Sequence, residues 1–166
     1  MASTYSSDLK LELVTTGEKA GLWGTITNTN LQILQQSSSG YLALAVGGSD
    51  VTLSLDNGAT SNGKNLYIKL TGTLTANRTV TMPASAERVF ILEDATVRGT
   101  SNRTLSVLTA SGTALPIPVG ATMLVKSDGT NTTKGITQKG YNTITDSNTP
   151  YTAIAADQIL ANTTAN

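Results

Sequence analysis

The sequence predicts a mainly β protein with one helix, and two observations carry this prediction. The first is composition: 29 of the 166 residues are Thr, and Thr, Ser, Asn and Gly together account for 71. Thr suits a pleated strand because it is β-branched, whereas Gly and Asn suit turns. The second is periodicity: beyond position 40, short apolar runs alternate with polar residues, as expected of strands with one buried face.

The N-terminal region is predicted to hold a short strand and the single helix. Three leucines alternate with charged residues over 9–13, which predicts a strand after a polar arm. Further along, the apolar spacing changes to steps of three and four, which predicts a helix over about 25–37. Either Thr25 or Thr27 is its expected N-cap, and Gly40 stands just beyond its end.

Short antiparallel strands are predicted for the rest of the chain up to about 138. Gly47-Gly48 is typical of a hairpin turn between the first two strands. The apolar run 88–92 favours a strand buried on both faces, and two prolines make 115–119 an expected edge strand. The expected strands are 41–46, 51–55, 66–70, 79–82, 88–92, 105–107, 115–119, 123–125 and 132–137. Such regular spacing indicates a β-sandwich or prism-like domain.

Three regions follow from these elements. Residues 1–40 form an N-terminal region with the helix, and 41–140 form the β domain. Residues 141–166 look like a linker followed by the start of a further module, because a new alternating pattern begins there without a closing element. The few large core residues suggest that partner chains complete the burial of apolar surface.

Composition also excludes several kinds of chemistry. The chain has no His and no Cys, which removes imidazole bases, disulfides and the metal sites that use these ligands. Eleven basic residues balance eleven acidic ones, so no charge excess attracts nucleic acid. No apolar run is long enough for membrane insertion, and no signal peptide is visible. We therefore expect no enzyme activity, no cofactor and no metal.

The remaining charged groups favour structural roles. Glu93 and Asp94 are the only adjacent acidic pair, but neighbours on a strand point to opposite faces, so a surface role is expected. The Asp-containing segments 56–58 and 128–131 are read as turns rather than calcium loops. A group of arginines indicates a solvated face, an intersubunit ion pair or a patch that binds sugar or phosphate. These are Arg78, Arg88, Arg98 and Arg103.

The helix supplies the candidate site. Its Trp23, the only Trp of the chain, is expected to anchor either the core or an interface, and the interface is favoured because one short helix has little core of its own. The candidate attachment residues are Trp23, Ile26, Asn28, Asn30, Leu31 and Leu34.

Several segments resemble virion proteins of tailed bacteriophages, of the marine or cyanobacterial type. Residues 17–31, GEKAGLWGTITNTNL, are similar to a segment near the N-terminus of tail fibres and tail-associated proteins, although Leu22 replaces a more usual Thr. Residues 70–84 and 88–96 resemble a repeated fibre module, in which Glu93-Asp94 replaces a neutral pair. The segments 118–131 and 151–163 resemble the end of that module and the opening of another.

The resemblance implies a structural part of the virion that is made in the cytoplasm of a bacterial host. It implies a homotrimer whose N-terminal region docks to tail proteins such as an adaptor, nozzle or baseplate. More distal parts would then face the host receptor. Two alternatives stay open: a capsid decoration or head-fibre protein, and a carbohydrate-binding or depolymerase module.

Overall fold

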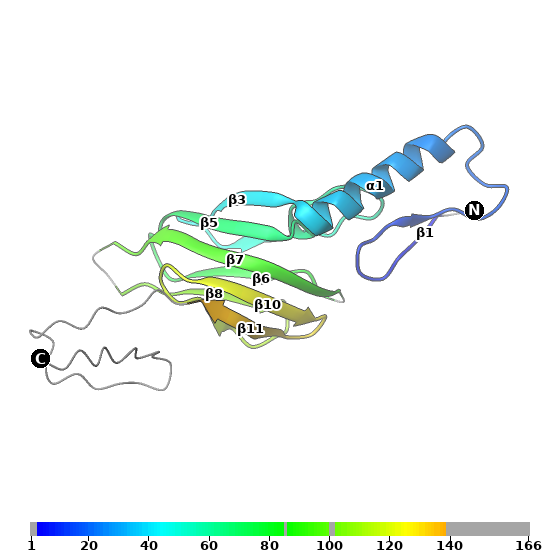
Figure 1. The fold of residues 1–166 in the computed structure, drawn as a ribbon. Helices are drawn as coiled ribbons and strands as arrows, with labels where there is room; N and C mark the ends of the chain where they lie inside the picture. Colours follow the sequence, from blue (N-terminus) through cyan, green and yellow to red (C-terminus); the bar gives the residue numbers. More distant parts are fainter. Residues whose placement is uncertain (1–2, 85, 100–101, 139–166) are drawn as a thin grey trace, which may run out of the picture.

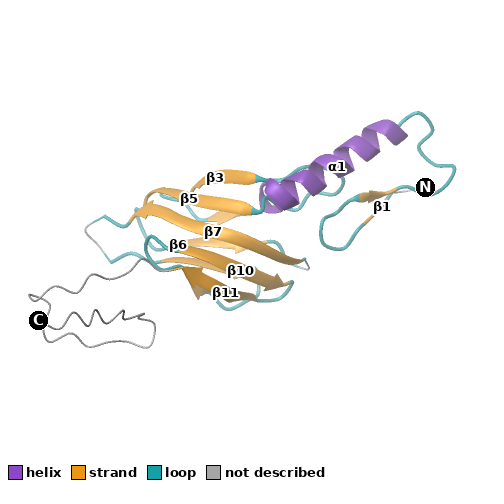
Figure 2. Cartoon of the chain, viewed as in Figure 1, coloured by secondary structure: helices purple, strands orange, loops and turns teal. Residues whose placement is uncertain are grey.

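A computed structural model describes residues 3–84, 86–99 and 102–138 (Figure 1). The described chain is mainly β with a single α-helix, which confirms the predicted fold class (Figure 2). The helical elements are α1 (Trp23–Ser39) and the 3-10 turn η1 (Asn62–Lys64). The strands are β1 (Thr4–Tyr5), β2 (Glu12–Leu13), β3 (Tyr41–Ala45), β4 (Val51–Thr52), β5 (Tyr67–Thr73), β6 (Arg78–Met82), β7 (Glu87–Val97), β8 (Leu105–Thr109), β9 (Leu115–Pro116), β10 (Thr122–Asp128) and β11 (Thr132–Gln138).

The N-terminus forms a small hairpin rather than an arm and a strand. β1 pairs with β2 in antiparallel orientation, so the predicted strand over 9–13 is wrong except for its last two residues. Lys10 has a positive φ of 57°, which turns the chain where the alternation of leucines suggested extended backbone. The hairpin closes through a hydrogen bond from the Ser6 amide to the Leu11 carbonyl, 2.9 Å long.

The helix α1 contains the whole predicted range and adds two residues at each end. Its N-cap is Leu22, which offers no side-chain hydrogen bond, so the prediction of a Thr cap is wrong. Gly40 does end the helix, and its amide donates to the Gln36 carbonyl at 2.9 Å. Its φ of −66° is ordinary, but an added Cβ would stand 2.3 Å from that carbonyl oxygen. Close approach of the backbone therefore explains this glycine.

Two sheets face each other and form a sandwich. The five-stranded sheet has the order β11-β10-β7-β5-β3, and the four-stranded sheet has the order β4-β6-β8-β9. From β3 to β8 the chain alternates between the sheets, so it winds through three turns of a parallel two-sheet solenoid. The expectation of antiparallel strands is wrong for this part, and it holds for β10 with its two neighbours and for β8 with β9.

The predicted hairpin between the first two strands of the domain is also wrong. Gly47-Gly48 is a corner where the chain passes from one sheet to the other, since β3 pairs with β5 and β4 pairs with β6. A Cβ on Gly47 would stand 2.6 Å from the Thr73 carbonyl oxygen. Gly72, which has a φ of +104°, lies in the next turn of the solenoid and its Cβ would stand 3.1 Å from the Gly47 nitrogen. The stacked corners thus need small residues.

The hydrophobic core fills the space between the sheets. Strand β7 is the centre of the larger sheet, and its residues alternate between buried and exposed, with Phe90 and Leu92 inside and Val89 47% exposed. The expectation that both faces of 88–92 are buried is therefore wrong. The core consists of Val46, Leu53, Ile68, Leu70, Leu74, Val80, Met82, Phe90, Leu92, Leu105, Val107, Ile117, Ala121, Met123 and Val125.

The last strands close one end of the sandwich. β9 is an edge strand that ends in Pro116, as predicted, and β10 and β11 form a hairpin around Asp128 and Gly129. The Asp128 side chain accepts the amides of Thr130 at 2.9 Å and Asn131 at 2.7 Å, which confirms the predicted turn. The predicted linker and further module in 141–166 lie outside the described residues.

Candidate functional site

The helix α1 projects from the end of the sandwich along the direction of β3 (Figure 1). Two contacts near its C-terminus hold it there. Ile33 is fully buried, and the Gln36 side chain donates to the Ser61 carbonyl at 3.0 Å and accepts the Ser61 amide at 3.3 Å. Both contacts lie in the last two turns of α1. The earlier turns of the helix therefore extend beyond the two sheets (Figure 1).

Asn30, one of the predicted attachment residues, binds the N-terminal hairpin. Its Oδ1 accepts the Glu12 amide at 3.0 Å, and its Nδ2 donates to the Glu12 carbonyl at 2.9 Å. The Asn30 side-chain amide thus makes the pair of hydrogen bonds to the Glu12 backbone that a neighbouring strand would make at the edge of β2. This role is internal to the chain, so Asn30 positions the hairpin instead of lying free for a partner.

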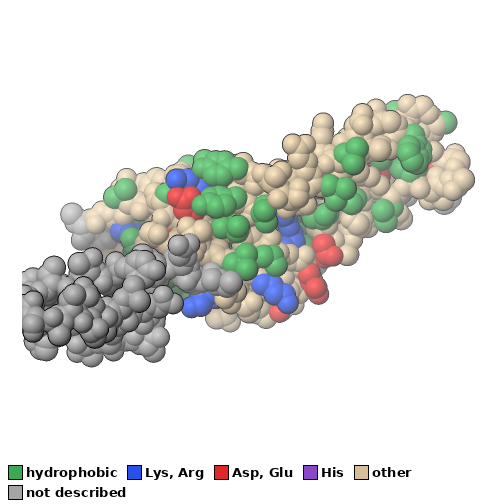
Figure 3. Space-filling model, in the orientation of Figure 1, with side chains coloured by type: hydrophobic (Ala, Val, Ile, Leu, Met, Phe, Trp, Pro, Cys, Tyr) green, Lys and Arg blue, Asp and Glu red, His purple; other side chains and the backbone are tan. Residues whose placement is uncertain are grey.

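Three of the predicted residues are exposed apolar side chains of α1, and we call these three together the helix stripe. Trp23 is 64% exposed, Leu31 57% and Leu34 42%. At about 100° per residue, Leu34 lies about 20° and Leu31 about 80° around the helix from Trp23. Hydrophobic side chains are visible along this arm of the molecule (Figure 3). Trp23 is therefore no core anchor of this chain.

The other two predicted residues lie beside the helix stripe. Ile26 is half-buried, and Asn28 is exposed about 140° around the helix from Trp23. The sequence pattern grouped all six residues because it could not tell which side of the helix would meet the hairpin. Exposure rather than helix side sets Trp23, Leu31 and Leu34 apart, because Asn30 lies only about 20° around the helix from Trp23.

No residue of α1 carries a charge, which is unusual for a helix with so much exposed surface. Its polar residues are Thr, Asn, Gln and Ser only. Several Ser and Thr hydroxyls bond back to carbonyls of the preceding turn, such as Thr29 to Thr25 at 2.9 Å. A second copy of this helix could thus approach without repulsion between like charges.

A second partly apolar surface is the outer face of the five-stranded sheet. Tyr41 and Tyr67 stack with ring centroids 5.6 Å apart, and Ile91 and Leu124 continue the same row across β7 and β10. In the adjoining row Lys69 forms an ion pair with Glu93, with Nζ 2.9 Å from Oε1. The exposed charges of this face are therefore partly neutralised within the sheet.

Glu93 and Asp94 point to opposite faces of β7, as predicted. The Glu93 carboxylate accepts the Tyr67 hydroxyl at 2.7 Å, and this bond raises the pKa of Tyr67. Lys69 and Tyr67 together lower the pKa of Glu93. Asp94, by contrast, is buried beside Arg98, so the predicted surface role is wrong for it. The two carboxylates do not converge on one substrate.

The expectation of a solvated face is wrong for Arg88, which is buried, whereas the other three arginines of the group are half-buried. Each guanidinium is held by nearby groups of its own chain: Arg78 donates to the Gly48 carbonyl at 2.6 Å, Arg98 to Asp94 and Arg103 to the Leu74 carbonyl. Arg88 is buried and donates to two carbonyls of the η1 loop. These hydrogen bonds give each guanidinium a structural role within the chain, while an intersubunit ion pair and a patch for sugar or phosphate stay predictions.

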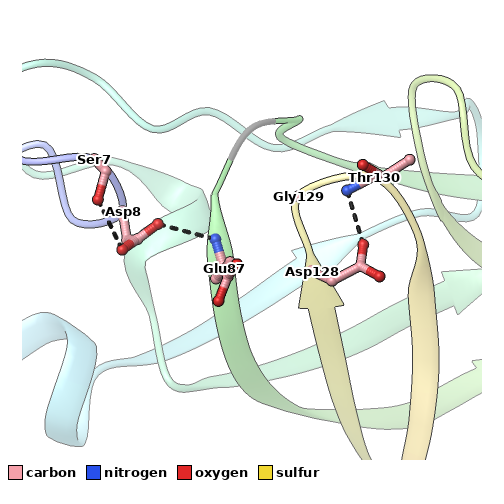
Figure 4. A pocket seen from close by; sticks show the side chains of 6 residues that line it. All are labelled: Ser7, Asp8, Glu87, Asp128, Gly129 and Thr130. Atoms are coloured by element: carbon pink, nitrogen blue, oxygen red, sulfur yellow. Dashed lines mark hydrogen bonds between the residues drawn. The ribbon is translucent and has the colours of Figure 1, made fainter.

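An open depression of about 520 Å³ lies where the N-terminal hairpin meets the β10–β11 turn (Figure 4). Of its three carboxylates, those of Asp8 and Asp128 already have hydrogen-bond partners, whereas Glu87 takes part through its backbone amide. Asp8 accepts the Glu87 amide at 3.0 Å and the Ser7 hydroxyl at 2.9 Å, and these bonds lower its pKa. The amides of Asn131 and Thr130 likewise lower the pKa of Asp128. These bonds join segments of the chain and give no sign of a ligand.

Two findings concern metals and membranes. Across residues 3–84, 86–99 and 102–138, no group of three or more Asp and Glu side chains is arranged to hold a metal ion. In the same ranges no helix combines the length and the hydropathy that a membrane span requires.

Comparisons with known proteins add no relatives. No protein-family model, no curated protein and no solved structure matches this chain.

Proposed function

We propose that this chain is a non-enzymatic structural protein of a bacteriophage virion, most specifically the N-terminal part of a tail fibre. One observation carries the proposal: the segment that resembles tail-fibre N-termini, 17–31, runs into α1, the element that projects from the sandwich with an exposed apolar stripe. A large exposed Trp with neighbouring leucines is typical of a protein interface.

We propose further that the helix stripe packs against copies of itself in a homotrimer. Two features support self-association. Trp23, Leu31 and Leu34 leave much apolar area to cover, and α1 has no charges that would repel an identical helix. Docking to a tail protein would use the tip of the same helix, and more distal parts would support recognition of the host receptor.

The alternative of a depolymerase has less support in this part of the chain. Glu93 and Asp94 lie on opposite faces of β7, and in the depression the Asp8 and Asp128 carboxylates bind backbone amides or a hydroxyl. Glycoside hydrolysis requires two carboxyl groups that flank one bond. The outer-face tyrosines could contact a sugar ring, but they lack such a pair beside them.

The test is the location of the chain on the particle. Antibodies raised against the purified chain are bound to virions of the phage whose genome encodes it, and the label is located by electron microscopy. Label on the tail is the expected result. Label on the capsid overturns the tail-fibre proposal in favour of a head-fibre or decoration protein, and virions without label overturn both. Release of sugar from host polysaccharide by the purified chain would overturn the non-enzymatic role.

A further inference from the structure

The edges of the two sheets are protected to different degrees. The four-stranded sheet ends in β4 and β9, which have two residues each; β9 also carries Pro116. The five-stranded sheet ends in β11 and β3. β11 has an irregular register with β10 and carries Lys134, and Thr132 at its start donates to the Val107 carbonyl of the other sheet at 3.2 Å. Short strands, prolines, bulges and lysines are the usual devices against edge-to-edge pairing.

Strand β3 has none of these devices. It is five residues long, its sequence YLALA contains no charge and no proline, and its register with β5 is continuous. Its inward side chains, Leu42 and Leu44, are only half-buried, although Leu44 packs against the core. The helix α1 leaves β3 along the strand direction and does not lie over its free edge (Figure 1). The β3 edge of the five-stranded sheet is therefore not covered by the helix.

The hydrogen bonds to β5 identify which backbone groups of β3 are free. The Gly40 carbonyl accepts the Tyr67 amide, and the Val46 amide donates to the Thr71 carbonyl, both at 2.9 Å. Because successive residues of a strand direct their amides to opposite sides, residues 40, 42, 44 and 46 face β5. The amides and carbonyls of Tyr41, Ala43 and Ala45 then face the open edge. An unpaired row of this kind is a template for another strand.

We propose that the β3 edge pairs in antiparallel orientation with the β3 edge of a second copy, about a two-fold axis at Ala43. This register makes hydrogen-bonded pairs of Ala43 with Ala43 of the partner subunit and of Tyr41 with Ala45 of the partner subunit, about six bonds in all. The larger Tyr ring thus lies opposite a small side chain. Leu42 lies opposite Leu44 of the partner subunit on the core side, which extends the core across the contact.

Charge favours a copy of the same chain as the occupant. β3 contains no charged residue, so an identical strand meets no like charge, and the chain as a whole has a formal net charge of zero. The result is one continuous sheet built from two five-stranded sheets. A two-fold contact uses the same surface on both copies and closes on itself, so it does not propagate into a fibril.

This contact is separate from the helix stripe. The proposed trimer requires a three-fold axis through the helices, whereas the edge contact requires a two-fold axis, and the two share no residues. A chain that uses both would join one trimer to another. The edge contact therefore does not depend on the proposed function. An experiment that overturns the edge contact does not overturn the proposed function, and the converse also holds.

The test uses single cysteines, since the native chain has none. In Ala43→Cys the two Cα atoms lie about 5.5 Å apart across the axis, within the usual range for a disulfide. In the control Ala45→Cys, each residue lies two positions from the axis, so four residues at about 3.3 Å along the strands and about 5.5 Å across them separate the two Cα atoms by about 14 Å. Both positions are small and exposed, so random collisions affect both equally.

Mild oxidation of the full chains, followed by nonreducing electrophoresis, is expected to yield a covalent dimer at least tenfold faster for Ala43→Cys than for Ala45→Cys. Equal rates indicate collision alone and overturn the proposal, as does absence of dimer from both. Faster dimer formation by Ala45→Cys overturns the register. A trimeric mass without the Ala43→Cys dimer overturns the edge contact and leaves the proposed function intact. An Ala43→Cys dimer without a trimeric mass supports the edge contact and overturns the proposed trimer.

Discussion

Removal of the Trp23 side chain should weaken self-association without unfolding the chain. Trp buries about 150–250 Å² when fully covered. Since 64% of Trp23 is exposed, roughly 130 Å² is left for a partner to cover, at the mid-range area. At about 25 cal/mol per Å² this amounts to about 3 kcal/mol per chain, or about 10 kcal/mol for a trimer. The dissociation constant of the trimer should then rise by about seven orders of magnitude for Trp23→Ala.

The assay is analytical ultracentrifugation over a dilution series, together with circular dichroism. The matched control is Asn28→Ala, an exposed residue of the same helix outside the helix stripe. We expect Trp23→Ala to sediment as smaller species at concentrations where the native chain and the control remain associated. The far-ultraviolet spectra should agree, because Trp23 contributes nothing to the core of its own chain. Identical dissociation of Trp23→Ala and the control would refute the reasoning.

Three further predictions concern the chain itself. Leu92→Ala, at a fully buried position of β7, should lower the free energy of unfolding by about 3 kcal/mol, whereas Val89→Ala on the outer face of the same strand should cost less than about 1 kcal/mol, as measured by urea titration. Equal costs would contradict the assignment of the two faces. Asn30→Ala should release the hairpin, so that the β2 amide it holds exchanges its hydrogen about ten- to a hundredfold faster while the core amides stay protected. Asp128 should stabilise the fold above the ordinary Asp pKa of about 4 and lose that effect as the pH falls through its lowered folded pKa, since the unfolded chain then binds the proton more readily. The native chain should therefore lose more stability between pH 6 and pH 3 than Asp128→Asn, which keeps the acceptor oxygen but does not titrate; an equal loss would contradict this role.

Local structure was largely predictable because it depends on neighbours in the sequence. The helix, the turn at Asp128 and most strand positions follow from spacing and turn residues. The pairing of the strands did not follow, because a period of two describes one strand and carries no information on its partner or its direction. Gly47-Gly48 illustrates the limit: a glycine pair suits a hairpin turn, but here the need is close packing against the Thr73 carbonyl at the next corner.

The candidate site was predictable only where it depends on residues that are close in the sequence. Helical spacing placed Trp23, Leu31 and Leu34 near one another, and their exposure fits the predicted interface. Spacing could not reveal that Asn30 binds the backbone of Glu12, since this contact joins residues that are 18 positions apart. The buried Asp94–Arg98 pair was missed because adjacent carboxylates suggested a surface, although strand alternation directs one of them inward.

The native mass of the intact chain at low concentration tests the central claim most directly. The claim is that the projecting helix assembles this chain into a trimeric virion part. One chain has a mass of 17.2 kDa, so native mass spectrometry should find assemblies built from three chains, of about 52 kDa, or pairs of these. A mass of 17.2 kDa across the whole concentration range, or a dimer without any trimer, would contradict the account.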